Sequence, residues 1–254
     1  MLLAVDIGNT NITLGVFEDE NHGPRLRFAS DPVRTADEYG LAVLESFRRA
    51  GVAVEAIHAI AIGSVVPDLT PMFTEACVNY LDCRPFVADG TMKTGLSSKY
   101  DNPGQIGIDR LVDAAAAYKL YGGPSCVIDF GTATTFDAVS VDGCHFGGAI
   151  APGMGIAAEA MFQRAEKLPR VDYERPASVI GCNLRQSLQS GLLYGYTGLV
   201  EGMIARFRAE LGPDMKVVAT GGLAEVIAEE TAAIDILAPW LMLDGLRILY
   251  HMNS

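Results

Sequence analysis

Long apolar runs and an excess of positive charge are both absent from this sequence of 254 residues. No uninterrupted apolar stretch reaches the roughly 18 residues that a membrane-spanning helix needs, so we expect no membrane partner. The net charge of −12 argues against a nucleic-acid binder, because such a protein needs a basic surface to meet phosphates. The first apolar run has no basic region before it and is broken by Asp6, so we expect no signal peptide.

Cysteine and histidine are sparse and show no spacing typical of metal ligands. The cysteines form no Cys-x-x-Cys pair and are odd in number: Cys77, Cys83, Cys126, Cys144 and Cys182. We therefore expect reduced, mostly buried thiols, which fit a cytoplasmic protein. The histidines are isolated, and we expect each to be a surface or core side chain: His22, His58, His145 and His251.

The composition is that of a globular protein with a large core. Half of the residues are hydrophobic and a fifth are charged. Short β-branched runs alternate with helical patterns along the chain, which predicts the α/β class, with helices packed on a sheet. A chain of this length could form one large domain or two smaller ones.

The N-terminal segment reads as an apolar strand, a polar turn and a second strand. Gly8 allows a ligand to approach the backbone because it has no Cβ. Asn9, Thr10 and Thr13 can donate hydrogen bonds to phosphate oxygens, as can the N–H groups of the turn. Asp6 stands at the end of the strand, where its carboxylate could hold Mg²⁺. An ordinary hairpin with polar turn chemistry explains the segment equally well.

The same layout returns between Val127 and Val139, where Asp129 and Gly131 repeat the Asp-x-Gly of the first hairpin. Asp6 and Asp129 are 123 positions apart (129 − 6), close to half of the chain, which predicts two similar folding units. We place the boundary after residue 110, giving units 1–110 and 111–254. Two phosphate-binding hairpins that face each other across an inter-domain cleft would form a nucleotide site.

Other segments carry polar residues or glycine beside predicted elements. Residues 89–106 form a polar loop of the length that is often functional. An alanine-rich helix follows, so Asp109 and Arg110 lie near a helix N-terminus that can hold anions. Gly221 and Gly222 form a turn after a predicted strand at 216–220, where a flat ring could lie against the backbone, although a plain strand-to-helix connection is equally compatible.

Several boundaries follow from turn signals and periodicity. Asn21–Pro24 predicts the turn before a strand at about 25–29. Gly147–Gly153 predicts a glycine-rich turn that leads into a helix. A long helix is predicted over 183–211, with an interruption near Gly195, and the leucine-rich tail predicts a docking helix.

Taken together, the motifs are similar in order and spacing to those of one family. They are Asp6–Asn11, Arg34–Tyr39, Gly63–Pro67, Tyr100–Pro103, Gly107–Arg110, Asp129–Thr134, Gly147–Gly153 and Ala219–Leu223. Over essentially the whole chain they resemble the type III pantothenate kinases (Bvg accessory factor family) of the actin-like, sugar-kinase-like ATPase superfamily. The resemblance implies two actin-like (ribonuclease H-like) units, a homodimer, and phosphorylation of pantothenate by ATP with Mg²⁺, the first step of coenzyme A biosynthesis.

The resemblance also implies roles for single residues. The first phosphate loop would consist of Asp6, Ile7, Gly8, Asn9, Thr10, Asn11, Ile12 and Thr13. Thr132 would reach the ATP phosphates, and Gly221 and Gly222 would lie beside the adenosine. Asp129 would hold a monovalent cation, K⁺ or NH₄⁺. The pantothenate pocket would include Tyr100, Gly107, Ile108, Asp109, Arg110 and Leu184, with Asp109 as general base.

From the residues alone, simpler roles remain open for several of these positions. Asp109 is equally suited to a helix cap or a first-turn acid. Arg110 could be an ion-pair partner and Tyr100 a packing residue. Asp129 could hold Mg²⁺ instead of a monovalent cation.

Leu184 departs from the family pattern, which usually has a threonine that contacts pantothenate. Losing one polar contact typically costs about 0.5–1.5 kcal/mol. A kinase of the same fold acting on another hydroxylated acid therefore stays open. The resemblance also leaves open a nucleotide-binding regulator without turnover, because accessory regulators belong to the same family.

Overall fold

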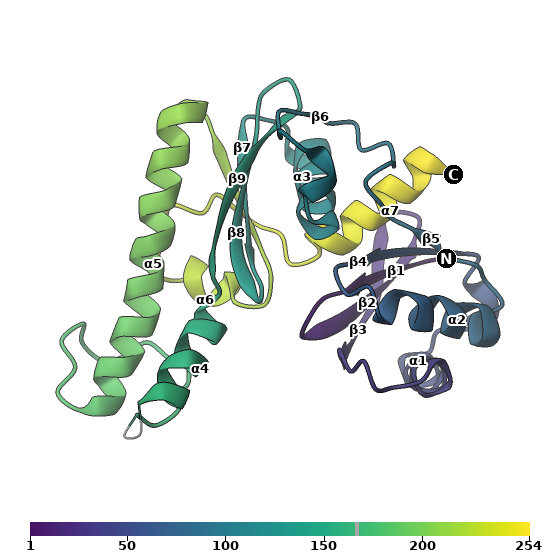
Figure 1. Ribbon diagram of the computed structural model, residues 1–254, viewed down its shortest axis with the longest axis horizontal. Coiled ribbons are helices and arrows are strands. Elements are labelled where there is room, and N and C mark those ends of the chain that lie inside the picture. The colour runs from purple at the N-terminus through teal and green to yellow at the C-terminus, as the bar shows by residue number, and fades with distance from the viewer. Residues whose placement is uncertain (166–167) are drawn as a thin grey trace. The chain divides into compact units, whose positions relative to one another are not determined.

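The computed structural model describes residues 1–165 and 168–254, and its chain divides into two compact units (Figure 1). Unit 1 contains Met1–Leu96, Asp101–Ala116 and Trp240–Ser254; unit 2 contains Ser97–Tyr100 and Ala117–Pro239. The division differs from the expected boundary after residue 110, because the C-terminal segment belongs to unit 1.

Unit 1 is built on a five-stranded sheet in the order β3-β2-β1-β4-β5. Its strands are β1 (Leu2–Ile7), β2 (Asn11–Glu18), β3 (Asn21–Ala29), β4 (Ala59–Ser64) and β5 (Phe86–Val87). Its helices are α1 (Ala36–Ala50), α2 (Leu69–Leu81), the first part of α3 (Ile108–Tyr121) and α7 (Leu241–Asn253), with 3₁₀ turns at Val54–Ala56 and Pro103–Gln105.

Unit 2 is built on a six-stranded sheet in the order β11-β10-β7-β8-β9-β6. Its strands are β6 (Ser97–Ser98), β7 (Ser125–Phe130), β8 (Ala133–Val139), β9 (Cys144–Pro152), β10 (Lys216–Thr220) and β11 (Ile236–Leu237). Its helices are α4 (Met154–Arg164), α5 (Leu184–Leu211) and α6 (Ala224–Ala228), together with the end of α3.

The two sheets share one topology. In unit 1, β1 pairs antiparallel with β2 and parallel with β4, while β2 continues antiparallel to β3 and β4 parallel to β5. In unit 2, β7, β8, β9, β10 and β11 repeat these five positions with the same directions. Strand β6 is added at one edge. The predicted duplication is therefore confirmed at the level of strand order.

Alternation along β1 gives unit 1 a core on each face of its sheet. Leu3 and Val5 belong to the cluster packed with α1 and α2, whereas Leu2 and Ala4 belong to the cluster packed with α3 and α7. A Cβ at Gly245 would lie 2.5 Å from Val112 Cγ1, so α7 and α3 approach closely. The predicted docking helix is confirmed, and its burial explains why the tail belongs to unit 1.

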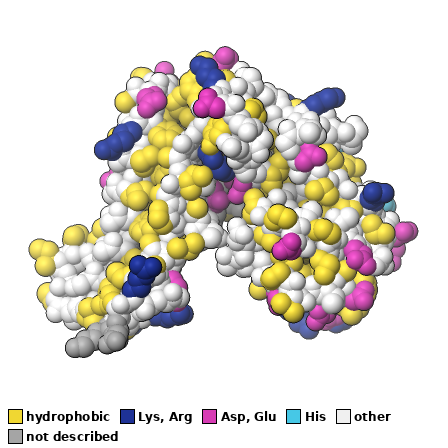
Figure 2. Space-filling model, in the orientation of Figure 1, with side chains coloured by type: hydrophobic (Ala, Val, Ile, Leu, Met, Phe, Trp, Pro, Cys, Tyr) yellow, Lys and Arg dark blue, Asp and Glu magenta, His cyan; other side chains and the backbone are white. Residues whose placement is uncertain are grey.

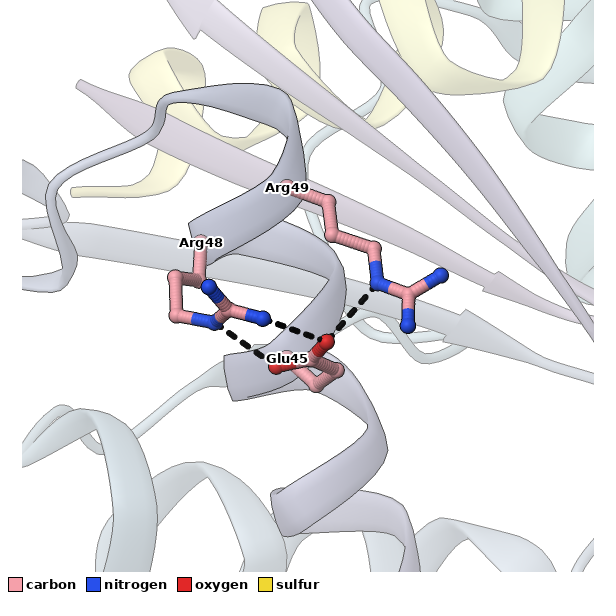
Figure 3. Close-up of polar contacts among 3 residues, drawn as sticks. All are labelled: Glu45, Arg48 and Arg49. Carbon is pink, nitrogen blue, oxygen red and sulfur yellow. Dashed lines mark hydrogen bonds and ion pairs between the residues drawn. The ribbon is translucent and has the colours of Figure 1, made fainter.

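Helix α1 carries start and stop signals of its own. Thr35 and Glu38 form a capping box at its start, and Gly51 ends it with a φ of 72°. Glu45 binds Arg48 and Arg49 in the last turns (Figure 3). The hydrogen bonds from Arg48 and then Arg49 lower the pKa of Glu45 from 4.5 to about 2, although all three side chains are exposed.

In unit 2, α5 and α6 pack on β7 and β10. The shared core includes Ile128, Leu193, Val200 and Val217.

On the face that Figure 2 shows, lysine and arginine side chains are interspersed with acidic ones. Among the helices of the described residues, none combines the length and apolar character that crossing a bilayer requires.

The thiols are mostly buried, as expected. Cys77, Cys126 and Cys144 are buried and Cys83 is partly buried, whereas Cys182 is exposed. Burial raises the pKa of the Cys77 thiol to about 12 and raises that of Cys126 as well. These thiols are therefore protonated and unreactive at neutral pH.

Three predicted boundaries are wrong. The turn before β3 lies at Asp19–Glu20, where Asp19 has a φ of 56°, and Gly23 lies within the strand, at an edge that tolerates the following proline. Gly147 belongs to β9, where it pairs with Ala138. Helix α5 runs without interruption through Gly195, since packing on the sheet outweighs the low helix propensity of glycine.

Candidate active site

The first hairpin connects β1 and β2 through Gly8, Asn9 and Thr10. The Gly8 N–H donates to Asn11 O at 3.0 Å, which closes the turn. The Ser30 N–H donates to Thr10 O at 3.0 Å, and the Ser30 hydroxyl donates to Gly8 O. The turn is thus held by a serine that directly follows β3 and that sequence analysis did not single out.

Side chains of the first hairpin differ in their access to a ligand. Asn9, Thr10 and Asn11 are exposed, so their polar groups can meet phosphate oxygens. Ile7 and Ile12 are fully buried and belong to the core, and Thr13 is 7% exposed. Any contact of the two isoleucines with ATP would therefore come through the backbone.

Asp6 is the last residue but one of β1 and lies between two neighbouring strands. It pairs across the sheet with Thr13 on β2 and with Gly63 on β4. Its side chain is half-buried, at the same end of β1 as the exposed turn. This position suits a carboxylate that holds Mg²⁺, an ion usually bound by one or two carboxylates together with substrate phosphates.

The turn of the second hairpin is one residue shorter than that of the first, and a further glycine, Gly153, packs against it. Gly131 and Thr132 connect β7 to β8, and the Gly131 N–H donates to Ala133 O at 3.1 Å. The Gly153 N–H donates to Thr132 O at 3.2 Å, and a Cβ on Gly153 would lie only 2.3 Å from that oxygen. The end of β9 can therefore close on this turn only because Gly153 has no side chain.

Asp129 lies beside the double-glycine turn after β10. It pairs with Thr220 across the parallel ladder. Gly221 has a φ of 91°, and a Cβ there would lie 2.3 Å from Asp129 Oδ1. A Cβ on Gly222 would meet nothing within 4 Å. The structure thus brings Asp129, Thr132, Gly221 and Gly222 into one part of unit 2, with open space beside Gly222.

Asp109 and Arg110 occupy the first turn of α3, as predicted. The Arg110 N–H donates to Asp109 Oδ1 at 2.8 Å, so this carboxylate caps the helix start. A Cβ on Gly107 would lie 2.5 Å from the same oxygen, so the Asp109 carboxylate can take this position because Gly107 has no side chain. Asp109 and Ile108 are half-buried, and Arg110 is buried.

Tyr100 follows the short strand β6 in unit 2. Its ring is stacked on the ring of His145, with centroids 6.2 Å apart and planes 12° from parallel. A Cβ on Gly147 would lie 3.5 Å from the Tyr100 ring. His145 is fully buried and binds Asp137 at 2.7 Å. Sequence analysis placed His145 only as a surface or core residue and did not single out Asp137, since their pairing depends on the register of β8 and β9.

Leu184 begins α5, directly after its N-cap. Asn183 Oδ1 accepts a hydrogen bond from the Gln186 N–H at 3.0 Å. The Leu184 side chain is 47% exposed, so it is not a core residue of unit 2. An exposed leucine at this position is available to a ligand but offers only apolar contact.

The predicted residues are divided between the two units. Unit 1 holds Asp6–Thr13 and Gly107–Arg110, while Tyr100, Asp129, Thr132, Leu184, Gly221 and Gly222 belong to unit 2. Within the described part of the chain, no three His, Cys, Asp or Glu side chains are grouped as a metal site.

Comparisons with known proteins identify the family of this chain. The family model for type III pantothenate kinases matches residues 2–206. The chain belongs to the type III pantothenate kinase family. It is 49% identical over 254 residues to a type III pantothenate kinase of Moorella thermoacetica, covering all of both chains. It is also 47% identical to that of Geobacter sulfurreducens, covering all of this chain and 99% of the relative. The resemblance seen in the motifs is confirmed.

Solved structures support the same fold at low sequence identity. A conserved Baf family protein from Campylobacter jejuni has a TM-score of 0.63 at 18% identity, covering 98% of this chain and 97% of that one. Component A of the (R)-2-hydroxyglutaryl-CoA dehydratase of Acidaminococcus fermentans has a TM-score of 0.52 at 14% identity, covering 99% and 96%. The predicted α/β fold with two actin-like units is confirmed.

Proposed function

We propose that this protein phosphorylates pantothenate to 4′-phosphopantothenate with ATP and Mg²⁺, the first step of coenzyme A biosynthesis. The primary hydroxyl oxygen of pantothenate attacks the γ-phosphorus of ATP. The bond from that phosphorus to the β,γ-bridging oxygen breaks, and ADP leaves with the electron pair. The hydroxyl proton passes to a carboxylate of the protein. Full-length similarity to the kinases of this family supports the proposal.

The duplicated hairpin is the observation that carries the proposal. Each unit has an aspartate, Asp6 or Asp129, as the last residue but one of its central strand, and a glycine begins the turn that follows the strand. Phosphoryl transfer depends mainly on positioning and on neutralising phosphate charge, and backbone N–H groups with bound cations provide both. We assign Asp6–Thr13 and Thr132 to the phosphates, and Gly221 and Gly222 to the adenosine.

Cations would complete the charge balance. We assign Mg²⁺ to Asp6, because that half-buried carboxylate lies near the end of its strand, beside exposed polar groups. We assign the monovalent cation, K⁺ or NH₄⁺, to Asp129, which lies against the backbone of Gly221. Either ion would offset negative charge near the phosphates when bound.

Asp109 is the candidate general base. Its carboxylate lies in the first turn of α3, where Oδ1 accepts a hydrogen bond from the Arg110 N–H, and a carboxylate can accept the hydroxyl proton. The Arg110 side chain supplies positive charge for anionic groups. We place pantothenate against Tyr100 and Gly107–Arg110.

Leu184 supports a second candidate, a kinase of the same fold for another hydroxylated acid. Its exposed side chain offers no hydrogen bond. We further propose a cytoplasmic homodimer, in keeping with the reduced thiols and the family pattern. The cleft predicted from the paired hairpins remains a prediction.

The experiment is a coupled assay of ADP release with ATP, Mg²⁺ and pantothenate, in K⁺ and again in Na⁺. Pantothenate-dependent turnover that rises with K⁺ would support the reaction and the cation. Basal ATP hydrolysis at a rate that pantothenate does not change would favour another substrate. ATP binding without any turnover would favour a regulator.

A variant tests the general base. Asp109→Asn should abolish turnover while ATP affinity stays nearly unchanged, because the amide cannot accept the proton. Asp68→Asn is the matched control: it makes the same change at the start of α2, where the exposed Asp68 side chain makes no capping bond. Turnover at the wild-type rate in Asp109→Asn would remove Asp109 from the chemistry.

A further inference from the structure

A buried histidine–aspartate pair lies behind Tyr100 in unit 2. His145 on β9 is fully buried, and Asp137 on β8 is 2% exposed. His145 Nε2 lies 2.7 Å from Asp137 Oδ1. A carboxylate only accepts hydrogen bonds, so Nε2 carries the proton and donates it. The pair fixes the plane of the imidazole ring from inside the sheet.

Tyr100 is held against that ring by its own backbone. Strand β6 pairs with β9 at Ser98 and His145, and the Lys99 N–H donates to His145 O at 2.9 Å. The Tyr100 N–H donates to Ser98 Oγ at 3.1 Å. The half-buried phenol ring then lies parallel to the imidazole at 6.2 Å, within the range of offset stacking.

Gly147 leaves room for the phenol ring. With a φ of 112°, Gly147 adopts a conformation that other residues rarely take, and a Cβ there would lie 3.5 Å from Tyr100. The phenol is therefore bounded by the imidazole and by a backbone without a side chain, so its orientation depends on His145.

We propose that His145, held by Asp137, is a positioning residue that orients Tyr100 for the hydroxylated acid substrate. This inference rests on the proposed function, in which Tyr100 lines the pantothenate pocket. His145 itself need not touch the substrate. Its effect is on substrate binding through Tyr100, so it should change the KM for pantothenate and leave the KM for ATP and kcat nearly unchanged.

His145→Gln removes the ring but keeps a donor for Asp137. We expect the KM for pantothenate to rise about 2- to 12-fold, the factor that corresponds to a stacked aromatic pair worth about 0.5–1.5 kcal/mol. His58→Gln, at an exposed histidine, is the matched control and should change nothing. An equal rise in the KM values for pantothenate and for ATP, or a fall in kcat alone, would show a merely structural role and overturn the proposal.

A double-mutant cycle with Tyr100→Leu tests the positioning role of His145 separately from the place of Tyr100 in the pantothenate pocket. If His145 acts through Tyr100, His145→Gln should have no further effect on pantothenate kinetics in the Tyr100→Leu background. Additive effects would overturn the positioning role while leaving the pocket intact. An unchanged KM for pantothenate in Tyr100→Leu alone would instead contradict the proposed pocket.

A measurement on the unaltered His145 covers the case in which His145→Gln does not fold. Of the four histidines, only His145 is buried, so its ring signal in an NMR spectrum is the one shielded from solvent. Pantothenate should shift this signal in the wild-type protein but not in Tyr100→Leu. Absence of a shift at saturating pantothenate would overturn the proposal.

Discussion

The two hairpins share a strand order but differ at the position beside their aspartates. In unit 1, Ser64 follows the residue paired with Asp6, and its hydroxyl is held by the Thr70 hydroxyl at 2.7 Å and by the Val66 N–H at 3.1 Å. In unit 2, the corresponding residue is Gly221, which packs directly on Asp129.

This difference shows how one scaffold can serve two tasks. Hydrogen bonds from the Ser64 and Thr70 hydroxyls to Val66 O hold the chain where it passes from β4 into α2. The double glycine after β10 leaves space beside Gly222 instead. Duplication therefore supplies two turns with N–H groups, while a few side chains decide which turn has room for a flat ring.

The largest expected effect comes from exchanging the two carboxylates for amides. Asp129→Asn should lower turnover at least about tenfold and remove the advantage of K⁺ over Na⁺, because a neutral amide holds a cation less strongly. Asp6→Asn should raise the Mg²⁺ requirement and keep the K⁺ response. Titrating each cation against each variant gives the answer, and identical responses would mean that the hairpins do not differ in the cation they hold.

Gly221→Ala should have the second-largest effect. The new methyl group would lie 2.3 Å from Asp129 Oδ1, and alanine disfavours a φ of 91°. We therefore expect the free energy of unfolding to fall by about 1–3 kcal/mol. Denaturant unfolding measures this change. Gly222→Ala is the control, since its methyl group would have open space. Equal stability of the two variants would contradict the close packing of Gly221 on Asp129.

Leu184→Thr tests a region without a counterpart in unit 1. Helix α5 lies between α4 and β10, where unit 1 has only a short 3₁₀ turn between α1 and β4. A threonine would restore a polar contact worth about 0.5–1.5 kcal/mol, lowering the KM for pantothenate about 2- to 12-fold. Steady-state kinetics measure it, with Leu184→Val as the apolar control. A raised KM would favour a different acid as substrate.

The smallest effect belongs to the surface of α1 in unit 1. Because the pKa of Glu45 is lowered from 4.5 to about 2, its ion pairs stabilise the fold above pH 4.5 and are lost as pH falls toward 2. Glu45→Gln should lower the Tm slightly at pH 7, less so in high salt, and by a decreasing amount as the pH falls through the lowered pKa of about 2. Thermal unfolding across that pH range would reveal it, and a difference that does not shrink as the pH falls would refute the ion-pair explanation.

Much of the fold could be predicted because it depends on local patterns. A continuous apolar run predicted β1, and the alanine-rich segment predicted α3 with Asp109 in its first turn. Turn signals were less reliable: Gly23 and Gly147 lie within strands, each beside an irregularity in the ladder, which is a position that glycine also favours.

The sequence by itself determined the repeat, the family and the identity of the candidate site residues, because hydrophobic periodicity and motif spacing are local properties of the chain. Tertiary structure alone decided that the C-terminal helix completes unit 1, that Gly153 and Gly221 close on the second hairpin, and that His145 lies between Asp137 and Tyr100. These contacts join residues from different strands and turns. They depend on register and on close packing, which no single segment specifies.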